Sequence, residues 1–201
     1  MGVRLQEIII KIFALFLCTA LLSSCVVLHE EYFHPQAEGA RVEKESCRGQ
    51  VGVDNQLIFP LNDVNVELHM WEYDGITRLG ISFKVFKSAN VVWPEQTVTA
   101  YMENNKKNLK IESFTRLRVE RLDRAEDNYK IHRKEYPISS VMDRTIDEEF
   151  ETFNKRFEIT DIGVEWVKIS GMKVIINGKE NLLSEIFFTK ENGLFLHPLN
   201  C

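Results

Sequence analysis

The feature that most limits the fold of this chain is a period of two over residues 64–85. Apolar residues occupy every second position over 64–70 and again over 79–85. Asp74 and Gly75 stand between the two runs, and this dipeptide is typical of tight hairpin turns. Successive side chains of a strand point to opposite faces of a sheet, so the pattern predicts a hairpin with one buried and one wet face.

Short β-rich segments recur along the rest of the chain, and we expect eight or nine strands in all. Besides the hairpin, they include residues 97–101, 109–122, 164–169, 172–176, 186–188 and 194–196. Lys190 to Gly193 is predicted to be a turn between the last two of these.

Residues 143–157 depart from this pattern. A capping motif is followed there by apolar side chains at helical spacing, which favours a short helix, although a strand beginning near Phe153 fits the same residues. The sequence therefore predicts a mainly β fold, a single antiparallel β-sandwich of immunoglobulin type with a helical excursion around 143–157.

The N-terminal residues combine the parts of an export signal. A basic segment precedes an apolar run over 12–22, which is shorter than the ~20 residues that a membrane-spanning helix needs. The sequence Leu22-Ser23-Ser24-Cys25 then resembles the lipobox of bacterial lipoproteins. This resemblance implies that residues 1–24 are a signal peptide and that Cys25 carries lipid, palmitate included. An uncleaved signal anchor over 8–28 is the alternative.

The same resemblance implies a location in the cell. Val26 follows the acylated cysteine, and a residue other than Asp at this position resembles the Gram-negative signal for transport to the outer membrane. We expect a lipid-anchored envelope protein, at the outer membrane and facing the periplasm. Residues 25–46 are polar and are predicted to be a lipidated tether, so that 47–201 form the folded domain.

Two of the four cysteines remain once Cys18 leaves with the signal and Cys25 acquires lipid. Cys47 and Cys201 are then two thiols in an oxidising compartment, which predicts one disulfide bond between the two ends of the domain. Two free thiols or a metal-binding pair are the alternatives.

Both ends of the mature chain carry a distinctive set of residues. They are Tyr32-Phe33-His34-Pro35, Gly39, Cys47-x-Gly49-x-x-Gly52 and the terminal Asn200-Cys201. In these features the chain resembles a group of uncharacterised Gram-negative lipoproteins of the outer-membrane type. The resemblance barely covers the middle of the chain. It implies the envelope address, agrees with the disulfide and carries no activity.

Charge excludes one class of partner. Removing residues 1–24 from the 201 leaves 177 residues, and it takes away two basic and one acidic side chain, so the net charge changes from −5 to −6. A mildly acidic domain has no electrostatic reason to bind nucleic acid. We therefore expect the lipid alone to hold the protein at the membrane.

Motifs that carry catalysis are missing from the sequence. It contains no Gly-rich phosphate loop, no Gly-x-Ser-x-Gly elbow and no His-Glu-x-x-His helix. Residues 29–34 are rich in His and Glu but lack the histidine spacing of a zinc site, so we expect no metal and no cofactor. Glu67 and Glu72 could form a glycosidase-style pair, although the polar face of a strand explains both.

His69, Trp71 and Tyr73 share one face of the predicted strand, where they form a candidate platform for a sugar or a peptide. The alternative is that Trp71 covers the edge of the core. We predict a non-catalytic binding or structural module rather than an enzyme, with an envelope protein or glycan as its partner. A small hydrolase acting on envelope polymer and a lipid-carrying β-barrel are the other hypotheses.

Overall fold

The computed structural model describes residues 26–44, 52–86, 89–123, 128–143, 150–160 and 163–197. Every regular element there is a β-strand, and all the paired strands are antiparallel. No helix in these segments is long and apolar enough to span a membrane. Cys25, Cys47 and Cys201 lie outside the described residues, so the lipid attachment and the disulfide remain predictions.

The described strands form three sheets. The seven-stranded sheet has the spatial order β10 (Asn128–Pro137), β9 (Ser113–Asp123), β12 (Phe150–Thr160), β5 (Ile76–Phe86), β4 (Val64–Tyr73), β3 (Asp54–Leu61) and β2 (Arg41–Lys44). The five-stranded sheet has the order β1 (Val26–Ala37), β16 (Ile186–His197), β13 (Trp166–Ser170), β7 (Val98–Met102) and β8 (Asn105–Leu109). The four-stranded sheet has the order β11 (Val141–Asp143), β6 (Asn90–Val92), β14 (Lys173–Ile176) and β15 (Lys179–Leu182).

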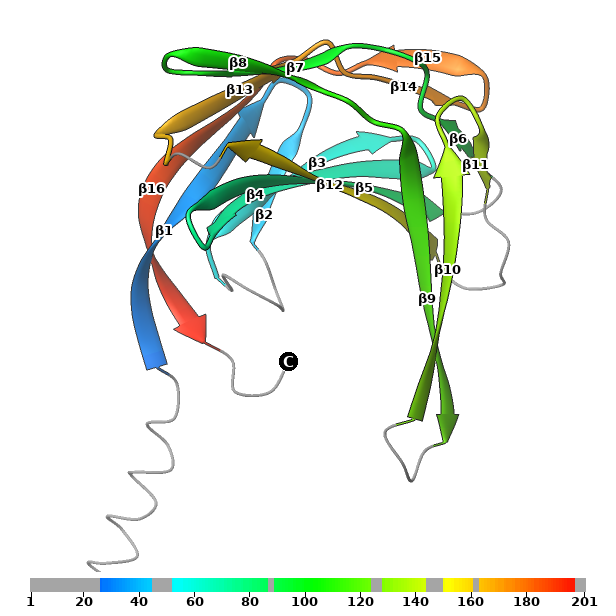
Figure 1. The fold of residues 1–201 in the computed structure, drawn as a ribbon, viewed down its shortest axis with the longest axis horizontal. Coiled ribbons are helices and arrows are strands. Elements are labelled where there is room, and N and C mark those ends of the chain that lie inside the picture. The colour runs from blue at the N-terminus through cyan, green and yellow to red at the C-terminus, as the bar shows by residue number, and fades with distance from the viewer. Residues whose placement is uncertain are drawn as a thin grey trace, which may run out of the picture.

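The two smaller sheets lie together over one face of the seven-stranded sheet (Figure 1). They share a layer because β13 leads into β14 through a bend at Gly171, whose φ of +79° suits a residue without a side chain. Apolar side chains of both layers form one core between them. The predicted β-sandwich is confirmed, with more strands than the eight or nine expected. A lipid-carrying barrel needs one closed sheet, whereas these sheets have free edges.

The hairpin of β4 and β5 forms as the sequence predicts. The two strands pair from Val64 with Val85 to Tyr73 with Ile76. Asp74 and Gly75 connect them with φ values of +55° and +70°, which is the geometry of the two-residue hairpin turn. The alternating apolar side chains of both strands are fully buried in the core.

The prediction of a helical excursion around 143–157 is wrong for the described part of this range, since Phe150–Thr160 is strand β12. β12 pairs with β5 over most of its length. Phe153 and Phe157 point into the core, while Phe150 lies on the other face, beside Phe86. A helix would put these three side chains on one stripe, and the sheet instead needs them on two faces.

The tether and the last turn also need correction. β1 and β2 occupy residues 26–44, and β1 pairs with β16 without interruption from Val26 with His197 to Ala37 with Ile186. Residues 190–193 therefore lie inside a continuous strand and make no turn. The physical reason is that β1 and β16 provide each other's backbone hydrogen-bonding partners. They are far apart along the chain, so patterns among neighbouring residues do not reveal the pairing.

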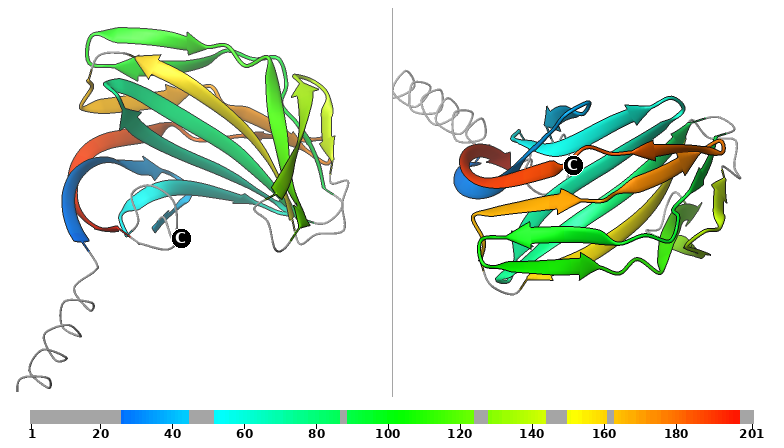
Figure 2. Two further views of the ribbon diagram at one scale, coloured as in Figure 1. Left: turned by 60° about the horizontal axis from the view of Figure 1, so that its bottom comes forward. Right: turned by 90° about the horizontal axis from the view of Figure 1, so that it is seen from above.

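Two ribbons of paired strands extend beyond the sandwich, one made by β1 and β16 and the other by β9 and β10. They project toward the same side of the molecule (Figure 1), and this holds when the molecule is turned (Figure 2). That side is the one faced by the outer surface of the seven-stranded sheet, the surface turned away from the core. The ribbons thus flank the part of the molecule where the candidate site lies.

Candidate functional site

The candidate site lies on this outer face, where β4, β5 and β12 are neighbours. The register places His69, Gly80 and Arg156 in one row across the three strands, and Trp71, Arg78 and Glu158 in the next row. These side chains point outward because the alternate positions of the same strands fill the core.

The structure brings His69 and Trp71 into contact as a stacked pair, with ring centroids 4.4 Å apart and an interplanar angle of 12°. Gly80 makes room for both rings. A Cβ atom at Gly80 would lie 2.6 Å from Cε1 of His69 and 3.2 Å from Cζ3 of Trp71. A glycine inside a strand marks such a close approach, and it lets the rings lie across β5.

The rings lie in a positively charged setting. Burial, with a smaller contribution from the charge of Arg156, lowers the pKa of His69 to about 4, so the imidazole is neutral at neutral pH. The guanidinium carbon of Arg156 lies 5.9 Å from the centroid of the Trp71 ring, a cation–π arrangement.

Arg78 completes the second row, and its side chain is only 21% exposed. Its guanidinium lies 5.7 Å from the ring centroid of Tyr73. One of its nitrogens, Nη1, donates to the Tyr73 carbonyl oxygen at 2.9 Å, while Nη2 lies 3.5 Å from the Glu158 carboxylate. Tyr73 itself is 70% exposed at the end of β4. It belongs to the rim of the site rather than to the stacked pair.

Two cavities meet at Trp71. The first, called here the arginine cavity, has a volume of about 600 Å³ and is lined by Trp71, Tyr73, Arg78, Arg156, Phe157 and Glu158. The second, called here the acidic cavity, has a volume of about 300 Å³ and is lined by Glu30, Glu31, Tyr32, Phe33, Trp71, Glu72, Asp74 and Lys190. Trp71 is therefore a wall of both.

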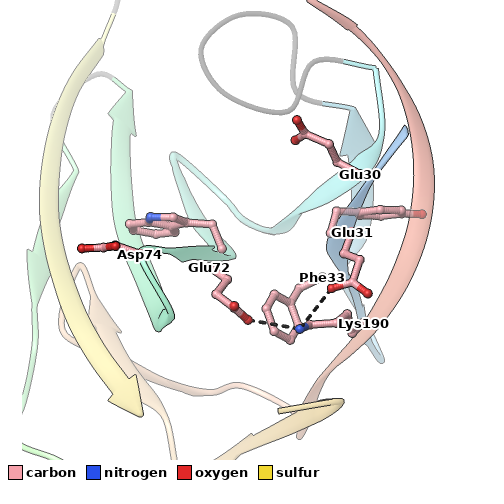
Figure 3. A pocket seen from close by; sticks show the side chains of 8 residues that line it. Glu30, Glu31, Phe33, Glu72, Asp74 and Lys190 are labelled. Carbon is pink, nitrogen blue, oxygen red and sulfur yellow. Dashed lines mark hydrogen bonds and ion pairs between the residues drawn. The ribbon is translucent and has the colours of Figure 1, made fainter. Parts of the chain in front are cut away.

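Lys190 is the central charge of the acidic cavity. Its Nζ lies 3.1 Å from Oε2 of Glu72 and 3.3 Å from Oε2 of Glu31, and the ammonium sits over the ring of Phe33 (Figure 3). Burial disfavours its charge, but the two ion pairs outweigh burial and raise the pKa of Lys190. This bridge ties the β1–β16 ribbon to β4.

The other groups of the acidic cavity do not join this bridge. Glu30 and Asp74 point away from Lys190 (Figure 3). Burial and a hydrogen bond to Glu191 raise the pKa of Tyr32 to about 12, so its phenol stays protonated. Within the described segments, no three His, Cys, Asp or Glu side chains are placed to hold a metal ion.

The structure does not bring Glu67 and Glu72 together. Glu67 lies on the same outer face as His69, opposite Ser82. Glu72 lies on the opposite face of β4, the face that carries the core residues, and forms an ion pair with Lys190. Burial raises the pKa of Glu67, and Gln56 donates to its carboxylate at 3.2 Å. The structure therefore contradicts a glycosidase-style pair of these two residues, which the sequence left open.

Sequence reasoning found His69, Trp71 and Tyr73 but missed Gly80, Arg156 and Lys190. Gly80 had a signal, because a glycine inside an alternating strand indicates a close contact. Arg156 was assigned to a helix, and the role of Lys190 depends on the unforeseen pairing of β1 with β16.

We compared the chain with models of protein families, with curated proteins and with solved structures, and none of them matches it. Function is therefore inferred from the two cavities and from the residues that line them.

Proposed function

We propose that this chain is a lipid-anchored protein of the cell envelope, held through Cys25 at the outer membrane and facing the periplasm, which acts as a non-catalytic binding or structural module. The observation that carries the proposal is the position of Trp71. Its ring lies on the outer face of the sheet and walls two cavities, instead of filling the core. Aromatic walls beside a few polar groups are typical of binding sites.

The lipid anchor would lie close to the folded domain. β1 begins at Val26, the residue after Cys25, so lipid on this cysteine would attach directly to the β1–β16 ribbon. That ribbon projects toward the side that the outer face also faces (Figure 1). A partner of the site would accordingly be found close to the membrane surface.

A small hydrolase is the second candidate, and one observation favours it. Four carboxylates line the acidic cavity, and paired carboxylates are the usual machinery of glycoside hydrolysis. Lys190 holds two of the four in ion pairs, which supports a structural role instead. Turnover of peptidoglycan or lipid by the purified protein, abolished by Glu72→Gln, would replace the module with the hydrolase.

The binding role is tested by placing a photo-crosslinking amino acid at Tyr73 in intact envelopes. Tyr101 of β7, on the other layer of the sandwich and 37% exposed, is the matched control position. We expect a crosslinked product at Tyr73 that is absent at Tyr101 and that Trp71→Ala reduces about fivefold, as for the loss of an aromatic anchor. Identical products from both positions would contradict the proposal.

The anchor is tested by Cys25→Ser. We expect this variant to lose metabolic labelling with palmitate and to accumulate as the uncleaved precursor, because the thiol is the acylated group. The matched control is Cys18→Ser, which should leave both labelling and cleavage unchanged. Equal labelling of the Cys25→Ser variant and the unmodified protein would refute the lipobox.

A further inference from the structure

The arginine cavity has an excess of positive charge. Arg78 and Arg156 lie diagonally across β5 and β12, since Arg78 is opposite Glu158 and Arg156 is opposite Gly80. Like charges at such positions repel each other. One carboxylate, Glu158, lines the cavity with them; it lies 3.5 Å from the Arg78 guanidinium and is 66% exposed. This excess occurs in a chain whose net charge is −5.

Arg156 is the cation whose charge no neighbouring carboxylate of the described residues neutralises. Among the described residues it has no ion-pair partner, and its only ring contact is the one with Trp71 at 5.9 Å. The residue opposite it on β5 is Gly80, which offers no side chain to pair with it. A guanidinium held against an aromatic ring keeps its N–H edges available, and these match the two oxygens of a carboxylate or phosphate.

Arg78 is held more firmly and points into the same cavity. Its contacts with the Tyr73 carbonyl oxygen and the Tyr73 ring fix its orientation, while its 3.5 Å separation from Glu158 is long for a charge-assisted hydrogen bond. A second oxyanion can therefore approach this guanidinium without displacing a short ion pair.

We propose that the arginine cavity binds the oxyanion group of an acidic ligand, a carboxylate or a phosphate, through the guanidinium groups of Arg156 and Arg78. This rests on the proposed function, because it names the ligand chemistry of the same binding face. Trp71 and Tyr73 act as positioning residues that hold the two guanidinium groups. The ligand's negative charge removes the repulsion between the arginines.

Anion binding also has a signature at His69. The charge of Arg156 is one cause of the low pKa of this histidine, so an anion on Arg156 raises the pKa of His69. A role of Arg156 in packing alone would leave the titration of His69 insensitive to anions.

The test uses the full chain, expressed and purified in detergent, with three sugars as probes. Glucuronate carries a carboxylate, glucose 6-phosphate a phosphate, and glucose neither. By calorimetry we expect at least one of the two anions to bind about tenfold more tightly than glucose, as expected for hydrogen bonds to a charged group. Binding by glucuronate alone assigns a carboxylated ligand, and binding by glucose 6-phosphate alone assigns a phosphorylated one.

Arg156→Gln should weaken the binding of that anion about tenfold. Arg133→Gln, the same change at an exposed arginine of β10 outside the cavity, should leave it unchanged. NMR titration of His69 should show a raised pKa with the anion in the unmodified protein and no change in Arg156→Gln. Equal binding of all three sugars, or equal losses in the two variants, would overturn the proposal.

These outcomes are separate from those of the proposed function. Crosslinking at Tyr73 without anion binding would leave the binding module standing and remove the oxyanion site. Anion binding by a protein that takes up no palmitate would retain the site and remove the anchor.

Discussion

The two faces of the β4–β5 hairpin share one backbone but differ in the side chains that they carry and in what those side chains contact. The inner face carries eight apolar side chains, each at most 1% exposed: Val64, Val66, Leu68, Met70, Leu79, Ile81, Phe83 and Val85. The outer face carries Glu67, His69 and Trp71 opposite Ser82, Gly80 and Arg78. One face is a continuous apolar surface, and the other is a set of specific polar and aromatic contacts.

The difference separates what stabilises the fold from what is available for binding. Burial of the inner face supplies stabilisation at about 25 cal/mol per Å² of apolar surface. On the outer face burial instead disfavours the charged forms of His69 and Glu67, lowering the pKa of the first and raising that of the second. Partly buried polar groups of this kind reduce stability, so a binding role offers a reason for their presence.

The largest effect is expected on the inner face. Phe83 is fully buried and packs against Phe114 and Trp93, with ring centroids 4.8 and 5.9 Å away. Phe83→Ala should lower the free energy of unfolding by about 3–5 kcal/mol. Ser82→Ala, which removes a 2.6 Å hydrogen bond to Asn154 on the outer face, should cost about 1 kcal/mol. Urea denaturation measures both free energies of unfolding. Similar losses in the two variants would contradict the difference drawn between the two faces.

The next effect is pH dependence from the outer face. The folded-state pKa of His69, about 4, lies below the ordinary value of 6.5. Between these values the unfolded chain binds a proton that the folded chain does not, so stability falls as the pH drops from 6.5 to 4. The loss should approach about 2 kcal/mol at the acid end, allowing for partial exposure. Denaturation of the unmodified protein and of His69→Gln over this range should show a smaller loss in the variant. Parallel curves would contradict the assignment.

Gly80→Ala tests the contact between the rings and β5. A Cβ here would meet His69 at 2.6 Å, so the stack must shift, at a cost of about 1 kcal/mol. His69→Ala removes the obstructing ring, so Gly80→Ala should lower the free energy of unfolding less in that background. A double-mutant cycle of the two changes should therefore show coupling, and simple additivity would mean that the ring does not lie over Gly80.

The smallest effect should come from Trp71→Ala. Because Trp71 lies outside the core, its removal should lower the free energy of unfolding by less than about 1 kcal/mol. Thermal unfolding measures this, with Phe83→Ala as the reference for a true core residue. A loss as large as that of Phe83→Ala would place Trp71 in the core and remove the basis of the binding site.

Local chemistry explains which parts of this fold could be predicted. Alternation over 64–85 and the Asp74-Gly75 turn are read from neighbours in sequence, and both are present in the structure. The same alternation put His69 and Trp71 on the outer face. Their partner Arg156 could not be placed in this way, because its strand joins β5 only through a contact between distant segments.

Gly193 shows why other predictions failed. After Asn192 it suggests a turn, but the structure uses its missing side chain for close packing. A Cβ atom there would lie 2.7 Å from Val53 and 3.0 Å from the ring of Tyr32. The approach to Tyr32 exists only because β1 pairs with β16, two segments that are far apart in sequence. A glycine by itself does not reveal which of these two uses applies.

The pairing of β1 with β16 also governs when the molecule can be completed. β1 leaves the ribosome well before its whole hydrogen-bonding partner, residues 186–197, has been made. The chain must therefore keep β1 as an open edge, with Phe33 uncovered, until residues 186–197 are available to pair with it. Open edges invite pairing with foreign strands. The period of greatest aggregation risk therefore lies between the synthesis of β1 and that of β16, and during this period a chaperone would have a defined segment to shield.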